Sequence, residues 1–97
     1  MSQHTYRNLS RTGIWVEVDT GWDRDEQSLF CTVRPLVDAQ LGEALYSMAD
    51  DPGAQPTDLN HVLRQLRDRF SIILPEEMVL NILRDVLNNY QVPQKVY

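Results

Sequence analysis

The segment IWVEVDTGWDRDEQSLFCTVR, residues 14–34, decides the fold because it predicts two β-strands joined by a polar turn. Residues 14–19 and 28–34 alternate apolar and mixed side chains with a period of two. Both stretches are also rich in β-branched and aromatic residues, which are typical of strands. Acidic residues interrupt the alternation between them. The segment therefore predicts an antiparallel β-hairpin.

The register of this hairpin follows from its apolar pattern. A turn centred between positions 24 and 25 places Val18 opposite Cys31 and Val16 opposite Val33. All four side chains then share one face with Ile14, and a slip of one residue would turn one strand's apolar set to the other face. We therefore expect this face to pack on the protein core.

The opposite face of the hairpin carries Trp15, Phe30 and Arg34, and this register places Arg34 opposite Trp15. Two interpretations stay open. In the first, this face is covered, either by helices of the same chain or by a second copy of the chain. In the second, it is an exposed aromatic patch that binds a partner. In the second case Arg34 could stack on the indole ring of Trp15.

The turn itself concentrates four carboxylates within eight positions, from Asp19 to Glu26. A calcium loop of the EF-hand type needs oxygen ligands at alternate positions, a central glycine and a glutamate at the twelfth position. Asp19, Asp23 and Asp25 do not follow that spacing, so a solvated turn is favoured over a metal site. The other interpretation is a surface that contacts a partner, and Trp22 keeps it open. A tryptophan beside a charged turn buries little of its surface unless it folds back onto the protein or meets a partner.

Elements on both sides extend the hairpin. Residues 4–9, HTYRNL, predict a third strand with a turn at residues 11–13. Downstream, residues 38–51 predict a first helix that begins at Asp38, and residues 58–69 predict a second helix with Thr57 as its N-cap. The predicted fold class is α+β, with an N-terminal antiparallel β-hairpin or small meander packed against three helices.

The third predicted helix begins at Pro75 and has the widest apolar face. Its apolar residues cover an arc of about 200°, whereas those of the second helix form a stripe of about 100°. Leu83 is expected at the centre of the buried part. An apolar arc this wide needs partners on two sides, so Leu80, Leu87 and Tyr90 are candidates for contact with a second copy of the chain.

Length and composition set the limits for the whole chain. Its 97 residues correspond to one domain, residues 1–97, with residues 1–12 and 91–97 as candidates for flexible ends. The net charge of −5 disfavours general nucleic-acid binding, because such a field repels phosphate groups. A single cysteine, no signal-peptide pattern and no long apolar run predict a cytoplasmic protein that is not inserted in a membrane.

The residue types that carry chemistry do not form a known constellation. His4 and His61 are far apart, and neither has a second histidine or cysteine at the spacing of a zinc site. Cys31 lies on the apolar face of the hairpin, where a buried and inert thiol is expected. We therefore predict no catalytic residue, no metal and no cofactor.

The sequence favours a small non-enzymatic protein–protein interaction or regulatory module that acts as a homodimer with a partner of unknown identity. The residues predicted to bind a partner are Trp15, Trp22, Phe30, Arg34, Leu80, Leu87 and Tyr90. The alternative is an acidic inhibitor, such as an antitoxin, an immunity protein or a phage-encoded blocker, that binds a basic partner. One contiguous acidic face would favour the inhibitor, and scattered acids would favour the module.

Overall fold

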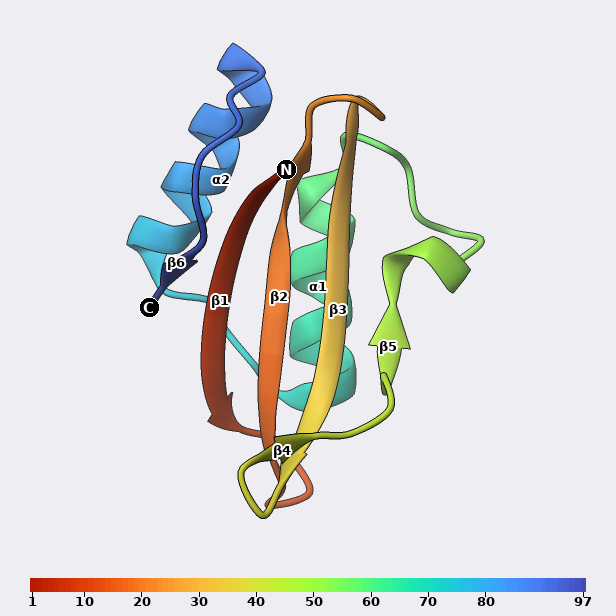
Figure 1. Cartoon of the computed structure of the whole chain (residues 1–97). Helices are drawn as coiled ribbons and strands as arrows, with labels where there is room; N and C mark the ends of the chain where they lie inside the picture. Colours follow the sequence, from red (N-terminus) through yellow and green to blue (C-terminus); the bar gives the residue numbers. More distant parts are fainter.

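Three long antiparallel strands form the centre of the sheet in the computed structural model, which describes residues 1–97 (Figure 1). They are β1, Ser2–Leu9, β2, Trp15–Asp23, and β3, Ser28–Val37. Three two-residue strands extend this centre, and the main path of the curled, mixed sheet runs β4-β3-β2-β1-β6. The short strands are β4, Gln40–Leu41, β5, Tyr46–Ser47, and β6, Lys95–Val96.

The predicted hairpin is confirmed as β2 and β3, but its predicted register is wrong by two residues. Val18 pairs with Val33, and Cys31 pairs with Thr20. The shift arises in the turn, where the Asp23 side chain accepts the backbone N–H groups of Asp25 and Glu26. Because a shift of two residues keeps side chains on the same face, the predicted apolar face is still the buried one.

The predicted third strand is confirmed as β1, which pairs along its whole length with β2. The two strands approach closely at Gly21, where an added Cβ atom would lie 1.9 Å from the carbonyl oxygen of Ser2. At the other end of the chain, β6 runs parallel to β1, and the backbone N–H of Tyr97 donates to the carbonyl of Thr5. Both ends of the chain are thus hydrogen-bonded into the sheet.

Two α-helices follow the strands and cover the same face of the sheet: α1, Leu59–Phe70, and α2, Glu76–Asn88 (Figure 1). Asp58, and not the predicted Thr57, caps α1, because its side chain accepts the backbone N–H of His61. Both helices end at a residue in the left-handed conformation, Ser71 for α1 and Asn89 for α2. Neither helix has the length and apolar character needed to cross a membrane.

The helix predicted over residues 38–51 is wrong, so the fold has two α-helices and not three. This stretch forms β4, β5 and a short 3-10 turn, η1, Met48–Asp50. Asp38 and Ala39 both have positive φ angles, which turn the chain back onto β3. The backbone N–H of Leu45 then donates to Val33 in β3. Pairing with a sheet edge outweighs the apolar spacing that favours a helix in isolation.

The core lies between the sheet and the two helices. Met78 and Ile82 are the α2 side chains at its centre, together with residues of β2, β3 and α1. Leu83 is not a core residue as predicted, because 39% of its surface is exposed. The helix is rotated so that Asp85 takes the next buried position instead.

Candidate interaction face

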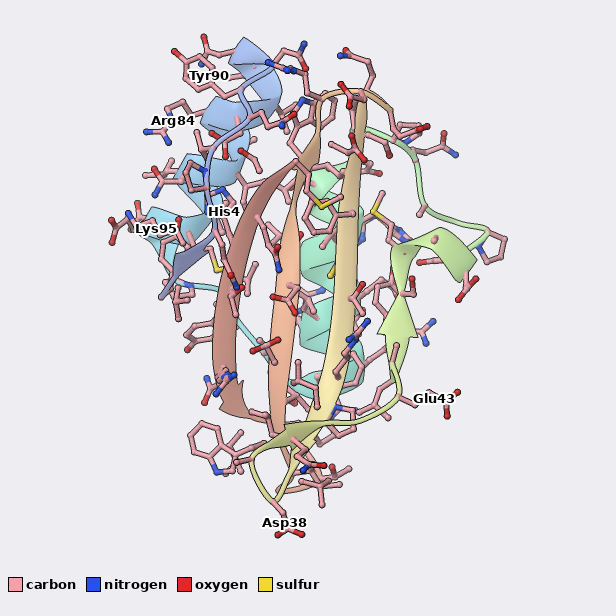
Figure 2. The ribbon with its side chains drawn as sticks, viewed as in Figure 1. His4, Asp38, Glu43, Arg84, Tyr90 and Lys95 are labelled. Carbon is pink, nitrogen blue, oxygen red and sulfur yellow. The ribbon has the colours of Figure 1, made fainter.

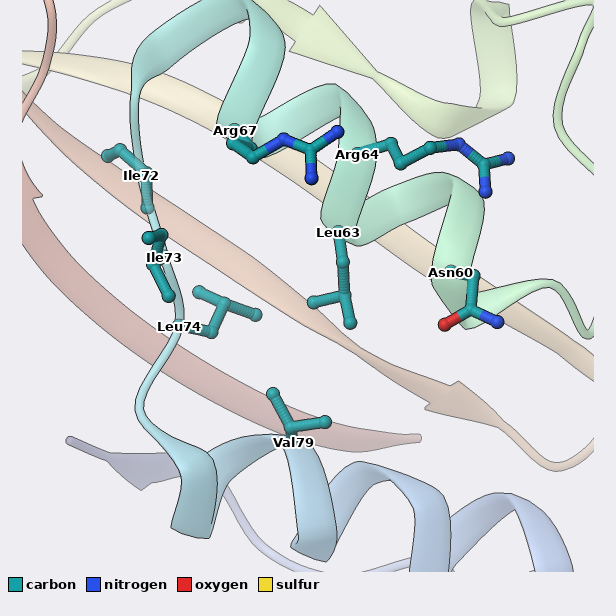
Figure 3. A pocket seen from close by; sticks show the side chains of 8 residues that line it. All are labelled: Asn60, Leu63, Arg64, Arg67, Ile72, Ile73, Leu74 and Val79. Carbon is teal, nitrogen blue, oxygen red and sulfur yellow. The ribbon is translucent and has the colours of Figure 1, made fainter.

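A groove runs between α1 and α2 on the side of the helices that faces away from the sheet. It encloses about 420 Å³, and the link from Ser71 to Pro75 closes one of its ends (Figure 3). Eight residues line it, namely Asn60, Leu63, Arg64, Arg67, Ile72, Ile73, Leu74 and Val79. Its volume falls within the range of roughly 300–1,000 Å³ that is usual for binding pockets.

The floor and the edge of the groove differ in chemistry. Leu63, Leu74 and Val79 point toward one another across the space between the helices (Figure 3). Arg64 and Arg67 lie along the α1 rim, one helical turn apart. The groove therefore offers an apolar floor with a basic edge.

The outer surface of α2 continues this apolar region. Leu80 and Leu87 are 57% and 81% exposed, and Leu83 lies beside them. At 100° per residue these three leucines fall within an arc of about 60°, roughly opposite the buried Met78. We call Leu80, Leu83 and Leu87 the α2 ridge. Ile73, which is 77% exposed, connects the ridge to the groove.

Charges on this face are separated between the two helices. Glu76 lies in the first turn of α2 on the same arc as the ridge, and it forms no ion pair. Its neighbour Glu77 lies on another side of the helix and pairs with Lys95 at 3.1 Å. On α1, Arg64 has no carboxylate partner, whereas Arg67 pairs only with the exposed Asp68 beside it.

A buried polar network holds α2 against β1, behind the ridge. His4 Nε2 lies 2.7 Å from Asp85 Oδ2, and His4 Nδ1 lies 2.7 Å from Tyr97 Oη. Asn81 donates to the same Tyr97 oxygen, so a consistent pattern has Tyr97 donating to Nδ1 and Nε2–H donating to Asp85. None of these side chains lines a cavity, which favours a structural role.

A second network fixes the loop before α1. Asp51 Oδ2 accepts a hydrogen bond from Tyr46 and lies 2.7 Å from His61 Nε2. These hydrogen bonds from Tyr46 and His61 lower the pKa of Asp51 to about 2. Burial, followed by the bond to Asp51, raises the pKa of Tyr46 well above its usual range. His61, which the sequence places on a polar face, is thus a largely buried tether between α1 and the loop.

The two groups of predicted contact residues lie on opposite faces of the sheet. Leu80 and Leu87 are on the exposed side of α2, and Tyr90, which follows the cap of the helix, is also exposed and lies beside Arg84. Trp15, which is 53% exposed, shares the other face of the sheet with Phe30 and Arg34.

Arg34 is paired across the strands with Glu17 and not with Trp15 as predicted. Burial and the neighbouring Asp19 raise the pKa of Glu17, which also accepts a hydrogen bond from Arg7. This face is therefore partly occupied by internal polar contacts.

Trp22 does not belong to either surface, because it is buried and its indole N–H donates to Asn89 at 2.8 Å. It folds back onto the end of α2 and is a core residue.

The thiol of Cys31 is also buried, and burial raises its pKa to about 12. No three side chains of His, Cys, Asp or Glu gather in a way that could hold a metal ion.

Sequence reasoning missed the two arginines as part of the site, and it missed Ile73. The apolar pair Ile72–Ile73 leaves open which of the two is buried, and only the path of the link shows that Ile73 points outward.

In comparisons with known proteins, no family model, no curated protein and no solved structure matches this chain.

Proposed function

We propose that this chain is a non-enzymatic protein–protein interaction module that acts as a homodimer through the face formed by α1 and α2. The observation that carries the proposal is the α2 ridge, three exposed leucines beside an apolar groove of about 420 Å³. Contiguous exposed apolar patches of more than a few hundred Å² usually mark an interface. A two-fold dimer closes such a patch on itself.

Magnitudes support a dimer whose formation depends on concentration. Covering Ile73 and the α2 ridge in both copies removes eight partly exposed apolar side chains from water. At roughly 1.5–3 kcal/mol for each full burial, and about half of that for side chains already half covered, the gain is on the order of 10 kcal/mol. Association costs roughly 4–15 kcal/mol, so the balance favours a reversible dimer over a permanent one.

The distribution of acids favours the module over the inhibitor. Exposed carboxylates lie on the β2–β3 turn, on both helices, and at the other end of the sheet, where Asp38 and Glu43 are found (Figure 2). They do not form one contiguous acidic face that could meet a basic partner.

Sedimentation equilibrium over a micromolar concentration series tests the proposal. We expect the mean mass to rise from 11.3 kDa toward twice that value as concentration increases. Leu80→Glu should hold the mass at the monomer value, because it places a carboxylate on the ridge. A wild-type protein that stays at 11.3 kDa throughout would refute the dimer. A dimer that survives Leu80→Glu would place the contact elsewhere, and the Trp15 face would be the next surface to test.

A further inference from the structure

The distribution of charge on the α1–α2 face indicates how two copies pack. The α1 side of the groove carries Arg64 and Arg67, and the α2 side carries Glu76 next to the ridge. Arg64 and Glu76 have no ion-pair partner within the chain, and Arg67 has only an exposed neighbour. The α1 rim of the groove is thus basic, and the first turn of α2, where Glu76 lies, is acidic.

Two copies can meet face to face in two symmetric ways. In the first, the two-fold axis lies in the interface and is perpendicular to the helices. Each helix then packs on its own counterpart, and Arg64 and Arg67 of one copy face the same arginines of the other. If the axis runs along the helices, α2 of each copy packs on α1 of the other. The first arrangement places like charges together, which suppresses association, and the second places opposite charges together.

The position of the charges along the helices agrees with the second arrangement. The two helices run in roughly opposite directions, and the link of residues 71–75 carries the chain back along α1, so α2 begins level with the middle of α1 (Figure 1). A rotation about an axis parallel to the helices does not change the position of a residue along that axis. Glu76 of one copy therefore comes opposite the middle of α1 in the other, where Arg64 lies, with Arg67 one turn further along α1.

We infer that the occupant of the groove is the α2 ridge of a second copy, held in register by an ion pair between Glu76 and the arginine rim of α1. This inference rests on the proposed homodimer and adds its arrangement. Leu80 and Leu83 of each copy then enter the groove of the other. By symmetry the ion pair occurs twice in one dimer, so a change at either position alters two contacts.

A charge-swap series measures this arrangement by sedimentation equilibrium, with circular dichroism as the check that each variant folds. Glu76→Arg and Arg64→Glu should each weaken the dimer about tenfold or more, since each creates two like-charge contacts. The double variant with both changes should return to within about threefold of the wild-type dissociation constant. Glu77→Arg is the matched control, because Glu77 pairs with Lys95 of its own chain, and it should change the constant less than about twofold.

The outcomes separate the two proposals. If the wild-type protein is a monomer, both the homodimer and this arrangement are overturned. The wild-type protein can be a dimer while the double variant has a dissociation constant weakened by both single effects combined. In that case the homodimer stands and the arrangement is overturned. Recovery in the double variant, with no effect of Glu77→Arg, supports both.

Discussion

His4 Nε2 and Asp85 Oδ2 lie 2.7 Å apart in the interior, where both side chains are almost completely buried. The contact joins the third residue of β1 to the C-terminal part of α2. Asp85 Oδ1 receives no hydrogen bond, and the nearest cation is the Arg84 guanidinium at 3.6 Å. The pair fixes the rotation of α2 about its axis, and that rotation determines which leucines reach the surface.

Removal of Asp85 should therefore be destabilising. We expect Asp85→Ala to lower the free energy of unfolding by roughly 1–3 kcal/mol, because it leaves the Nε2–H of His4 buried without an acceptor. Asp85→Asn keeps an acceptor for Nε2 and should lose less. Denaturant unfolding measures both, with Glu77→Ala as an exposed ion-pair control expected to change stability by no more than about 1 kcal/mol. Equal effects of Asp85→Ala and Glu77→Ala would show that the buried pair does not hold α2.

Adjacent residues of α2 should differ in their effect on stability. Ile82 is completely buried, so Ile82→Ala should cost roughly 2–5 kcal/mol of unfolding free energy. Leu83 lies on the ridge, and Leu83→Ala should cost clearly less in a dilute, monomeric sample. Denaturant melts of the two variants compare the same helix one residue apart. A larger loss for Leu83→Ala would mean that α2 is rotated from the position described.

Asp51 should make stability depend on pH in the acidic range. Hydrogen bonds from Tyr46 and His61 lower its pKa from 3.8 to about 2 in the folded protein, so the unfolded chain binds a proton more readily. The stabilisation is present above about pH 4 and is lost as the pH falls through about 2. The difference in unfolding free energy between wild type and Asp51→Asn should therefore shrink from pH 6 to pH 2. A difference that stays constant with pH would contradict this role.

The acidic β2–β3 turn should not bind calcium with high affinity. Asp23 already accepts two backbone N–H groups, and the remaining carboxylates do not have the alternate spacing of a calcium loop. Calorimetric titration with calcium should show no saturable heat in the micromolar range, and the emission of the buried Trp22 should not change. Saturable binding at micromolar calcium would overturn this prediction.

The sequence was sufficient to predict the elements whose local pattern agrees with their final packing. The alternation in β1, β2 and β3 and the apolar spacing in α1 and α2 are of this kind. Residues 38–51 were mispredicted because their apolar spacing fits a helix, whereas the positive φ angles at Asp38 and Ala39 and the free edge of β3 favour strands. The length of the β2–β3 turn was mispredicted because the Asp23 contacts cannot be read from spacing alone.

The candidate face was only half predictable for a similar reason. The wide apolar arc of α2 pointed to exposed Leu80 and Leu87, and both are exposed. The rotation of the helix was not predictable, because the buried Asp85 interrupts the apolar stripe and its partner His4 lies 81 residues away in sequence. Trp22 was misplaced since its partner, Asn89, lies 67 residues away in sequence.

Sedimentation equilibrium of Leu87→Glu beside Leu45→Glu is the most direct test of the proposed homodimer. Leu87 is 81% and Leu45 is 52% exposed, but Leu87 is on the α2 ridge, whereas Leu45 lies beside β5 and lines neither the groove nor the ridge. At a concentration where the wild-type protein is mostly dimeric, Leu87→Glu should have the monomer mass of 11.3 kDa and Leu45→Glu should keep the dimer mass. A wild-type protein that is monomeric at every concentration, or a dimer that Leu87→Glu leaves intact, would contradict the account.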